Sequence, residues 1–516
     1  MNFKRGGCLM KKQKMYKSWG LLFSSVLAVS AILSACQTSG TNPGASSASG
    51  TGGNAAAGSN SGSKQGAAEP AGPATVSMLN VYLSNTAPKA DGPIVKETER
   101  IANAKLNITY VPFNVYSEKL NVTMTSGDMP QAIMVENPFV TSIVNGIRAG
   151  MFWDLTPYLN EFPNLKKYDP QIMKNLSVDG KYYVIPRPRP LVRLATIIRK
   201  DWLDNVGLSE PKTVDEFYNM LKAFKEKDPD KNGVNDTYGM MIYENSIPTE
   251  IFAWFGAPNN WKVDDSGNFV KDVETKEYRE GLRFVRKLYN EDLINKNFAI
   301  VVRNEARKDL YNNKVGASIE AIDAVVPFYY FQMQDTKNFY KMTVSPPING
   351  KAYAASGHYG GALISKTSVK TEKDLRQVLR YFNAVNSDEA KAEFVKVAQE
   401  NDKKPAAEQF NLDDLKNLVT TDAIVYPTGT TDTDTLLKSR MTEYAAISIP
   451  DPSSALISPT QTEKNEQLKT ILTDARAQYI MGKIDDAGFD AAVAQWKKVG
   501  GDQVAKELAD LYKKSK

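Results

Sequence analysis

From residue 76 onward, short apolar runs alternate with segments in which apolar residues recur every three or four positions. The pattern predicts a strand over Val76 to Leu83, a helix over Ile94 to Leu106 and a second strand over Ile108 to Val111. A helix over Tyr116 to Ser126 and a short buried strand over Ala132 to Val135 are predicted next. This order is typical of an α/β domain with a mainly parallel sheet, whose ligands bind beyond the carboxyl ends of the strands. The polar residues expected at those ends are Ser84, Asn85, Glu136 and Asn137.

A second unit is predicted after residues 185–190, which read Ile-Pro-Arg-Pro-Arg-Pro. Alternate prolines exclude a central strand and favour a stiff connector. A strand over Leu194 to Arg199 and a helix over Asp201 to Val206 are predicted to follow. Thr213 to Glu216 forms a capping box that starts another helix. The aromatic stripes of this unit are predicted to be core, because their helical spacing is that of a buried face.

The first 35 residues differ from the rest in charge, since their six Lys and Arg are accompanied by no Asp or Glu. Four lysines precede an apolar stretch over Trp19 to Ile32, which is too short to span a bilayer comfortably. This order predicts an export signal over residues 1–35. Leu33 to Cys36 resembles the lipobox of bacterial lipoproteins, in which the cysteine carries acyl chains such as palmitate and anchors the protein in the outer leaflet of the cell membrane. The alternative is an ordinary secreted protein.

Residues 36–75 are predicted to be a lipidated cysteine followed by a flexible tether. Gly, Ser, Ala and other small or polar residues fill this segment, which lacks aromatic and branched aliphatic side chains. Such a composition cannot bury a core. With Cys36 acylated, the exported body has no cysteine, because the chain has only two and Cys8 lies in the signal.

Charge and composition exclude several classes of function. Removing residues 1–35 leaves 64 − 6 = 58 basic against 59 acidic residues, so the body lacks the excess of positive charge that nonspecific nucleic-acid binding requires. One histidine and two cysteines in the chain exclude a histidine-rich metal site, a cysteine cluster and a Cys/His nucleophile within the body.

Five segments together resemble the family 1 extracellular solute-binding lipoproteins of carbohydrate ABC importers, and the long Bacillota-type members most of all. These segments are Gly150 to Leu159, Asp179 to Pro186, Ile198 to Leu208, Pro211 to Phe217, and Tyr479 to Lys483 with Phe489 and Trp496. The resemblance implies an α/β, two-lobe, periplasmic-binding-protein-like fold (a Venus flytrap) with crossing hinge segments. It also implies a cleft that closes on a sugar, and delivery of that sugar to ABC permease subunits in the membrane.

The same resemblance places the lobe boundaries. Residues 76–188 and 321–360 are expected in lobe 1, and residues 189–320 and 361–516 in lobe 2, with the chain recrossing near Val315 to Glu320 and near Tyr359 to Ser365. Gly357, Gly360 and Gly361 suit a hinge at the second recrossing, since glycine absorbs large φ/ψ changes. A plain turn is the alternative.

Residues 228–237 match a calcium loop of EF-hand type. Oxygen side chains stand at positions 1, 3, 5 and 9, a glycine stands at position 6, and position 7 supplies a backbone carbonyl. The predicted ligands of a structural calcium ion are Asp228, Asp230, Asn232, Val234 and Asp236. Position 12 is Gly239 rather than glutamate, which lowers the expected affinity. Related binding proteins, including alginate-binding ones, carry such a loop after the same helix. A metal-free turn is the alternative.

Aromatic and polar residues that could bind a sugar occur at three places. Trp254 and Trp261 flank a loop rich in Gly, Pro and Asn, which favours a position in the cleft for at least one of them. His358 and Tyr359 lie at the expected return between the lobes, where His358 is interpreted as a hydrogen-bonding ligand or else a structural histidine. Arg187 could bind a hydroxyl or a carboxylate, so an acidic sugar is conceivable, although a surface role is the alternative.

The function predicted from these features is capture of a carbohydrate, expected to be an oligosaccharide, by a monomeric, extracytoplasmic, membrane-anchored protein without catalysis. A surface-anchored peptide-binding or adhesion module is one alternative. A glycosidase that uses two carboxylates is another, but pairs of acids are always found among 59 and carry no weight.

Overall fold

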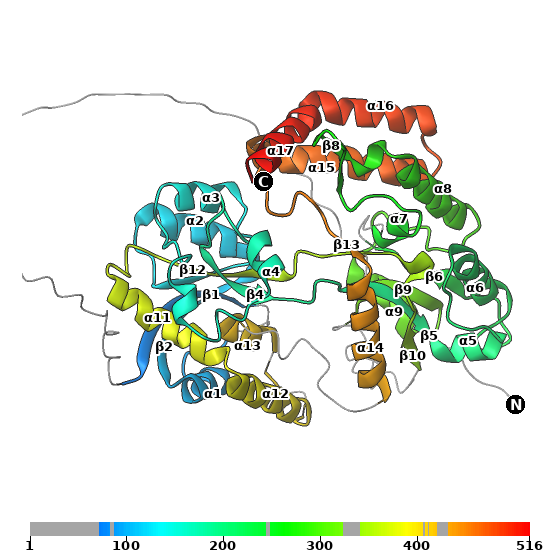
Figure 1. Cartoon of the computed structure of the whole chain (residues 1–516). Helices are drawn as coiled ribbons and strands as arrows, with labels where there is room; N and C mark the ends of the chain where they lie inside the picture. Colours follow the sequence, from blue (N-terminus) through cyan, green and yellow to red (C-terminus); the bar gives the residue numbers. More distant parts are fainter. Residues whose placement is uncertain are drawn as a thin grey trace, which may run out of the picture. The chain divides into compact units, whose positions relative to one another are not determined.

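A computed structural model describes residues 72–82, 87–243, 248–322, 341–405, 408–410, 412–420 and 432–515 (Figure 1). The chain divides into the units Met1–Pro70 and Ala71–Lys516, and the description below concerns the second. The predicted signal peptide, Cys36, nearly all of the predicted tether and Asn85 lie outside the described residues. Within the described ranges, no helix is long and apolar enough to cross a membrane.

The first lobe is built on a five-stranded sheet of order β2-β1-β3-β12-β4. Strands β1, β2 and β3 are mutually parallel where they pair, and β12 runs antiparallel to both β3 and β4. The strands of this sheet are β1 (Ala74–Tyr82), β2 (Ala104–Pro112), β3 (Ala132–Val135), β12 (His358–Ile364) and β4 (Val184–Pro188). The sheet is therefore mixed, although its amino-terminal half has the predicted parallel β-α-β order.

Helices cover both faces of this sheet, because alternate residues of β1 belong to two different apolar clusters. One face packs against α1 (Pro93–Ala102), α11 (Glu372–Val385), α12 (Asp388–Asp402) and α13 (Leu412–Val419). The other face packs against α2 (Tyr116–Ser126), α3 (Thr141–Arg148) and α4 (Pro170–Asn175). The first helix ends earlier than predicted, since Asn103 adopts a left-handed conformation (φ 46°) and stops it.

The second lobe is built on a four-stranded sheet of order β10-β5-β9-β6. Its strands are β10 (Met342–Val344), β5 (Leu194–Arg199), β9 (Val315–Ala321) and β6 (Tyr238–Met240). One apolar cluster joins this sheet to α5 (Lys200–Val206), α6 (Val214–Glu226), α7 (Glu250–Trp254), α8 (Lys276–Asn290), α15 (Pro459–Ile480), α16 (Asp486–Trp496) and α17 (Asp502–Ser515). A second cluster joins it to α9 (Arg303–Tyr311) and α14 (Asp432–Ala446).

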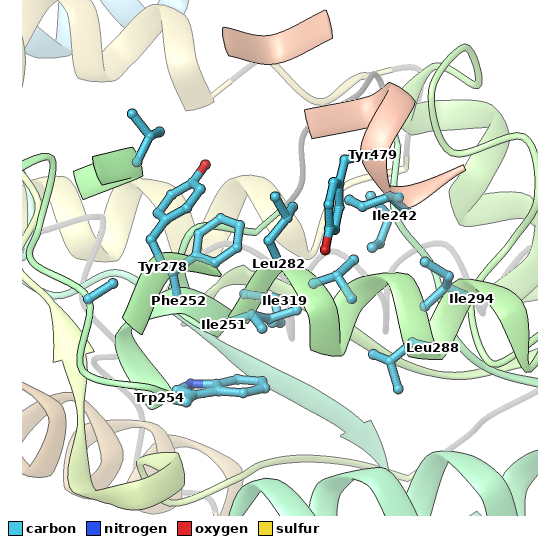
Figure 2. Close-up of a cluster of buried hydrophobic side chains, with 14 of the residues drawn as sticks. Ile242, Ile251, Phe252, Trp254, Tyr278, Leu282, Leu288, Ile294, Ile319 and Tyr479 are labelled. Atoms are coloured by element: carbon cyan, nitrogen blue, oxygen red, sulfur yellow. The ribbon is translucent and has the colours of Figure 1, made fainter. Parts of the chain in front are cut away.

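Aromatic rings fill the larger of these clusters, as the helical stripes predicted. Figure 2 shows Tyr278 of α8 beside Phe252 of α7, and their ring centroids are 4.2 Å apart in a stacked arrangement. The predicted capping box of α6 is confirmed, because the Thr213 hydroxyl accepts from the Glu216 N–H and the Glu216 carboxylate accepts from the Thr213 N–H. Strands β7 (Trp261–Val263) and β8 (Phe269–Lys271) pair as a short antiparallel hairpin.

The two points at which the chain was expected to pass from one lobe to the other are wrong. Strand β9, which was expected to lead back to lobe 1, lies inside the second sheet between β5 and β6. Strand β12, which was expected to return to lobe 2, lies inside the first sheet between β3 and β4. Residues 358–364 and the helices α11 to α13 therefore belong to lobe 1, whereas residues 341–353 pair with elements of lobe 2. Apolar periodicity did not distinguish the two sheets, since both offer buried positions for a strand.

Candidate functional site

Five of the predicted ligand-binding residues lie close together: two directly after β3, one on β4 and two at the start of β12. We call the group of Arg187, Glu136, Asn137, His358 and Tyr359 the hinge cluster. These residues arrive from three strands that are distant in sequence but adjacent in the first sheet. Strand β4 is an edge strand, which is the position that its two prolines permit.

Arg187 is the centre of the hinge cluster. Its side chain is only 2% exposed, so the surface role that was its alternative is wrong. The guanidinium Nε donates to the Tyr359 carbonyl at 2.8 Å, and the guanidinium carbon lies 4.6 Å from the centre of the Tyr359 ring. One terminal nitrogen lies 4.0 Å from Glu136 Oε1. A buried cation is thus held between an aromatic face and a carboxylate.

Tyr359 offers the accessible aromatic surface of the cluster. It is 40% exposed, which is high for a large ring, and Arg189 approaches the same ring at 5.9 Å. A ring fixed from one side by guanidinium groups can present its remaining surface to an apolar sugar face. The sequence predicted this residue from its position at the return between lobes.

His358 is a largely buried, neutral imidazole. Its Nδ1 accepts from the Gly360 N–H at 3.2 Å, and its ring meets Phe139 edge-on at 6.4 Å between centroids. Burial lowers the pKa of His358 to about 4. A neutral ring with Nδ1 already occupied retains one N–H, at Nε2, for a further partner.

Because His358 is the only histidine of the chain, its titration has a simple consequence for stability. Below about pH 6.5 the imidazole of the unfolded chain binds a proton that the folded chain accepts only near pH 4. The free energy of unfolding should therefore fall as the pH drops through this window, by about 2 kcal/mol between pH 7 and pH 5 from this group. Urea unfolding of wild type and His358→Gln at both values measures it. Equal losses in the two proteins would contradict this assignment.

A cavity of about 400 Å³ continues from the hinge cluster toward the C-terminal helices. Asn137, Phe139 and Thr141 line it from the first lobe, and residues 454–466 line it from the second. The Thr141 hydroxyl lies 3.4 Å from the Thr462 carbonyl. Phe139 contacts His358 and also lines this cavity, so the cluster and the cavity are adjoining. Sequence analysis missed Phe139, which falls in a loop with no periodic signal.

The two predicted tryptophans lie elsewhere, and they differ from each other. Trp254 ends helix α7, is 5% exposed, and packs edge-on against Phe217 at 4.9 Å in the core of lobe 2. The expectation that it belongs to a cleft loop is wrong, because one helical turn places it on a buried face. Trp261 lines a second cavity, of about 510 Å³, on the C-terminal side of the same lobe.

The predicted calcium loop is a turn in which the polar side chains contact one another and the backbone, and the Asn232 side-chain oxygen accepts from the Val234 N–H at 2.7 Å. Asp228, which has a φ of 45°, accepts from the N–H groups of Asn232 and Gly233 at 3.1 and 2.9 Å. The Asn232 amide donates to Asp230 at 2.9 Å and to Asp236 at 3.3 Å. Burial, reinforced by Asp228 and Asp236, raises the pKa of Asp230.

The carboxylate side chains of this loop are of the type that binds calcium. Oδ1 of Asp230 is buried and makes no hydrogen bond with the described residues. Such an oxygen, beside two further carboxylates, favours a cation. Among the described residues, however, no three acidic, histidine or cysteine side chains are arranged as a closed metal site. Asn313, from outside the loop, donates to Asp230 at 2.7 Å, a contact that the sequence could not indicate.

Two α/β lobes joined by crossing segments, with a buried polar cluster at the crossing, define the class of two-lobe solute-binding proteins. The family description "bacterial extracellular solute-binding protein" matches residues 84–392. The chain belongs to this family. Lipoprotein LipO of Bacillus subtilis is 36% identical over 468 residues, covering 86% of this chain and 93% of that protein.

Further relatives carry names that include a ligand. The polygalacturonan/rhamnogalacturonan-binding protein YtcQ of Bacillus subtilis is 32% identical over 484 residues, covering 88% of this chain and 94% of the relative. Among solved structures, an "HMO binding ABC-transporter associated" solute-binding protein from Bifidobacterium longum infantis aligns with a TM-score of 0.62 at 20% identity, covering 86% of this chain and 99% of that chain. The alginate-binding protein AlgQ2 aligns with a TM-score of 0.59 at 20% identity, covering 86% and 98%. These structures confirm the predicted two-lobe fold.

Proposed function

We propose that this protein captures an oligosaccharide outside the cell and delivers it to the permease of an ABC importer, without catalysing a reaction. The observation that supports this most directly is the hinge cluster, in which a buried arginine, an exposed tyrosine ring and a neutral histidine adjoin a cavity at the crossing of the lobes. Planar polar groups bind hydroxyls, and an aromatic ring binds the apolar face of a pyranose. The relative named for polygalacturonan/rhamnogalacturonan binding is consistent with this ligand class.

A thermal-unfolding screen tests the proposed function. Neutral and acidic oligosaccharides, together with peptides as the contrasting class, are added to the purified body. A ligand at 100 times its Kd should stabilise the protein by about 2.7 kcal/mol. Stabilisation by peptides and by no saccharide would favour the peptide-binding alternative, and accumulation of shorter saccharides during incubation would favour a glycosidase.

Closure of the lobes is the proposed means by which the permease distinguishes the loaded protein from the empty one. Small-angle scattering with and without a saccharide that binds measures this change. The radius of gyration should decrease on saturation. An unchanged radius would contradict the closing mechanism without contradicting capture.

The proposed location is the outer surface of the cell membrane, with acyl chains on Cys36 as the anchor and residues 37–73 as a tether. The tether is two residues shorter than predicted, because Ala74 and Thr75 belong to β1. Changing Cys36 to Ala should release the protein from washed membranes without altering its thermal unfolding, because two acyl chains supply stable anchoring and the core begins only at β1. Cys8→Ala is the matched control and should stay membrane-bound. Retention of the Cys36 variant would refute the anchor.

Asp228, Asp230, Asn232, Val234 and Asp236 are proposed to hold a structural calcium ion. Calcium should raise the unfolding temperature of wild type, and Asp230→Ala should abolish the increment, since a ligand is lost from a loop that already lacks the glutamate of position 12. Asp265→Ala, which changes an exposed acid in the β7–β8 turn, is the control that should keep the response. An equal calcium response in all three proteins would place the ion elsewhere.

A further inference from the structure

The second cavity of lobe 2, of about 510 Å³, combines an apolar floor with polar walls. Trp261 and Trp496 lie in the floor with their ring centroids 6.0 Å apart, and aliphatic side chains of α15 and α17 complete it. Its volume lies within the usual range for small-molecule sites, which is roughly 300 to 1,000 Å³. Neither the hinge cluster nor the calcium loop contributes to it.

One face of α15 forms a wall of this cavity, and its polar side chains change from neutral amides to cations along the helix. Gln461 and Asn465 stand at the amino-terminal end, and Lys469 and Arg476 follow on the same face. Amide groups, which bind hydroxyls, thus lead to two cations. The order indicates a ligand that is neutral at one end and negatively charged at the other.

Among the described residues, Lys469 and Arg476 form no ion pair with a carboxylate. Arg476 donates to the Leu472 carbonyl at 3.3 Å and to the Thr473 hydroxyl at 3.1 Å. Two carboxylates, Asp272 and Asp451, also line the cavity, and Asp451 accepts from the Asn260 amide at 2.8 Å. The remaining cation of the cavity differs, because Lys271 is bonded to Asp272 at 2.8 Å. Two cations are therefore available to a ligand.

This cavity adjoins the cavity beside the hinge cluster. Four residues line both of them, namely Leu456, Ser458, Gln461 and Asn465. A saccharide long enough to occupy both cavities would extend from the side of Phe139 to the side of Arg476.

We propose that the second cavity binds a carboxylated sugar residue at one end of a longer saccharide. Lys469 and Arg476 bind the carboxylate, the two tryptophans contact the apolar part of the sugar, and Gln461 and Asn465 bind hydroxyls of the unit before it. This subsite rests on the proposed function, since it extends the same binding path.

Isothermal titration calorimetry with oligogalacturonides tests the subsite. Each chain length from two to six units is used both as the free acid and as the fully methyl-esterified, neutral form. The double variant Lys469→Gln/Arg476→Gln should lose tenfold or more in affinity for the longer free acids and little for the esters. Raising the salt concentration should weaken the binding of the acids to wild type more than to the variant.

Two controls make the outcome decisive. Lys262→Gln removes one positive charge from the neighbouring position on β7, which is exposed and does not line the cavity, and it should bind like wild type. Lys469→Gln alone changes an exposed side chain and serves if the double variant unfolds early. An equal loss of affinity for acids and esters in the double variant would overturn the subsite alone. So would an unchanged affinity for both while wild type binds saccharide. Failure of wild type to bind any saccharide would overturn the proposed function and the subsite with it.

Discussion

Replacing Gly360 by alanine should prevent the first lobe from folding, or destabilise it by about 4 kcal/mol or more. A Cβ atom at this position would stand 1.8 Å from the Val135 carbonyl oxygen, which is a backbone atom of the neighbouring strand and cannot move aside. The φ of 66° adds strain for any residue with a side chain. Urea unfolding and the yield of folded protein measure the effect.

The variant Gly350→Ala separates the steric clash from the backbone strain as causes of this loss. Gly350 has a nearly equal φ of 60°, but a Cβ there would meet no atom within 4 Å. This variant should lose only about 1 kcal/mol, the usual cost of a left-handed conformation without a clash. Similar losses at both positions would mean that β12 can shift away from β3, and would contradict the close packing.

Replacing Arg187 by alanine should remove both stability and ligand binding. The change takes a cation away from Glu136 and leaves the Tyr359 carbonyl without the donor 2.8 Å away, so a loss of about 3 kcal/mol in the free energy of unfolding is expected. Saccharide affinity should fall as well, because the Tyr359 ring loses the guanidinium that holds it. Chemical unfolding and calorimetry measure the two effects.

A double-mutant cycle with Glu136 tests the cause. The variant Arg187→Ala/Glu136→Gln neutralises the remaining carboxylate and should recover part of the lost stability. Saccharide affinity should stay low in the double variant, because it still lacks the guanidinium group that contacts the Tyr359 ring. Additive losses of stability would indicate that Arg187 and Glu136 do not interact.

The local elements were predictable because each has its own signal in the sequence. The capping box of Thr213, the alternation of β1 and the β-α-β order all depend on neighbouring residues. The membership of β9 and β12 in their sheets was not predictable in this way. Both are short apolar runs, and which sheet they join depends on pairing with strands far away in the sequence.

The candidate site, like the fold, was predicted only in part. Residues at strand ends, such as Glu136 and Arg187, converge because sheet topology brings strand ends together. Trp254 does not join them, because it is the last residue of the five-residue helix α7 and its side chain packs in the core against Phe217. Lys469 and Arg476 went unnoticed because α15 has apolar residues on several sides, and its cavity-lining face emerges only when β7 and α17 pack beside it.

The position of β12 has a consequence for the order in which the protein folds during export. Gly361 pairs with Val135 on one side and Pro186 on the other, so the strand that joins β3 to β4 follows all four strands of the second sheet along the chain. Until that strand has crossed the membrane, β3 keeps an open edge capable of pairing with other chains. Closing such a distant contact is slow. Both lobes therefore depend on chain that follows residue 358, since α14 to α17 of the second lobe also come later, and fragments ending before residue 358 are expected to aggregate.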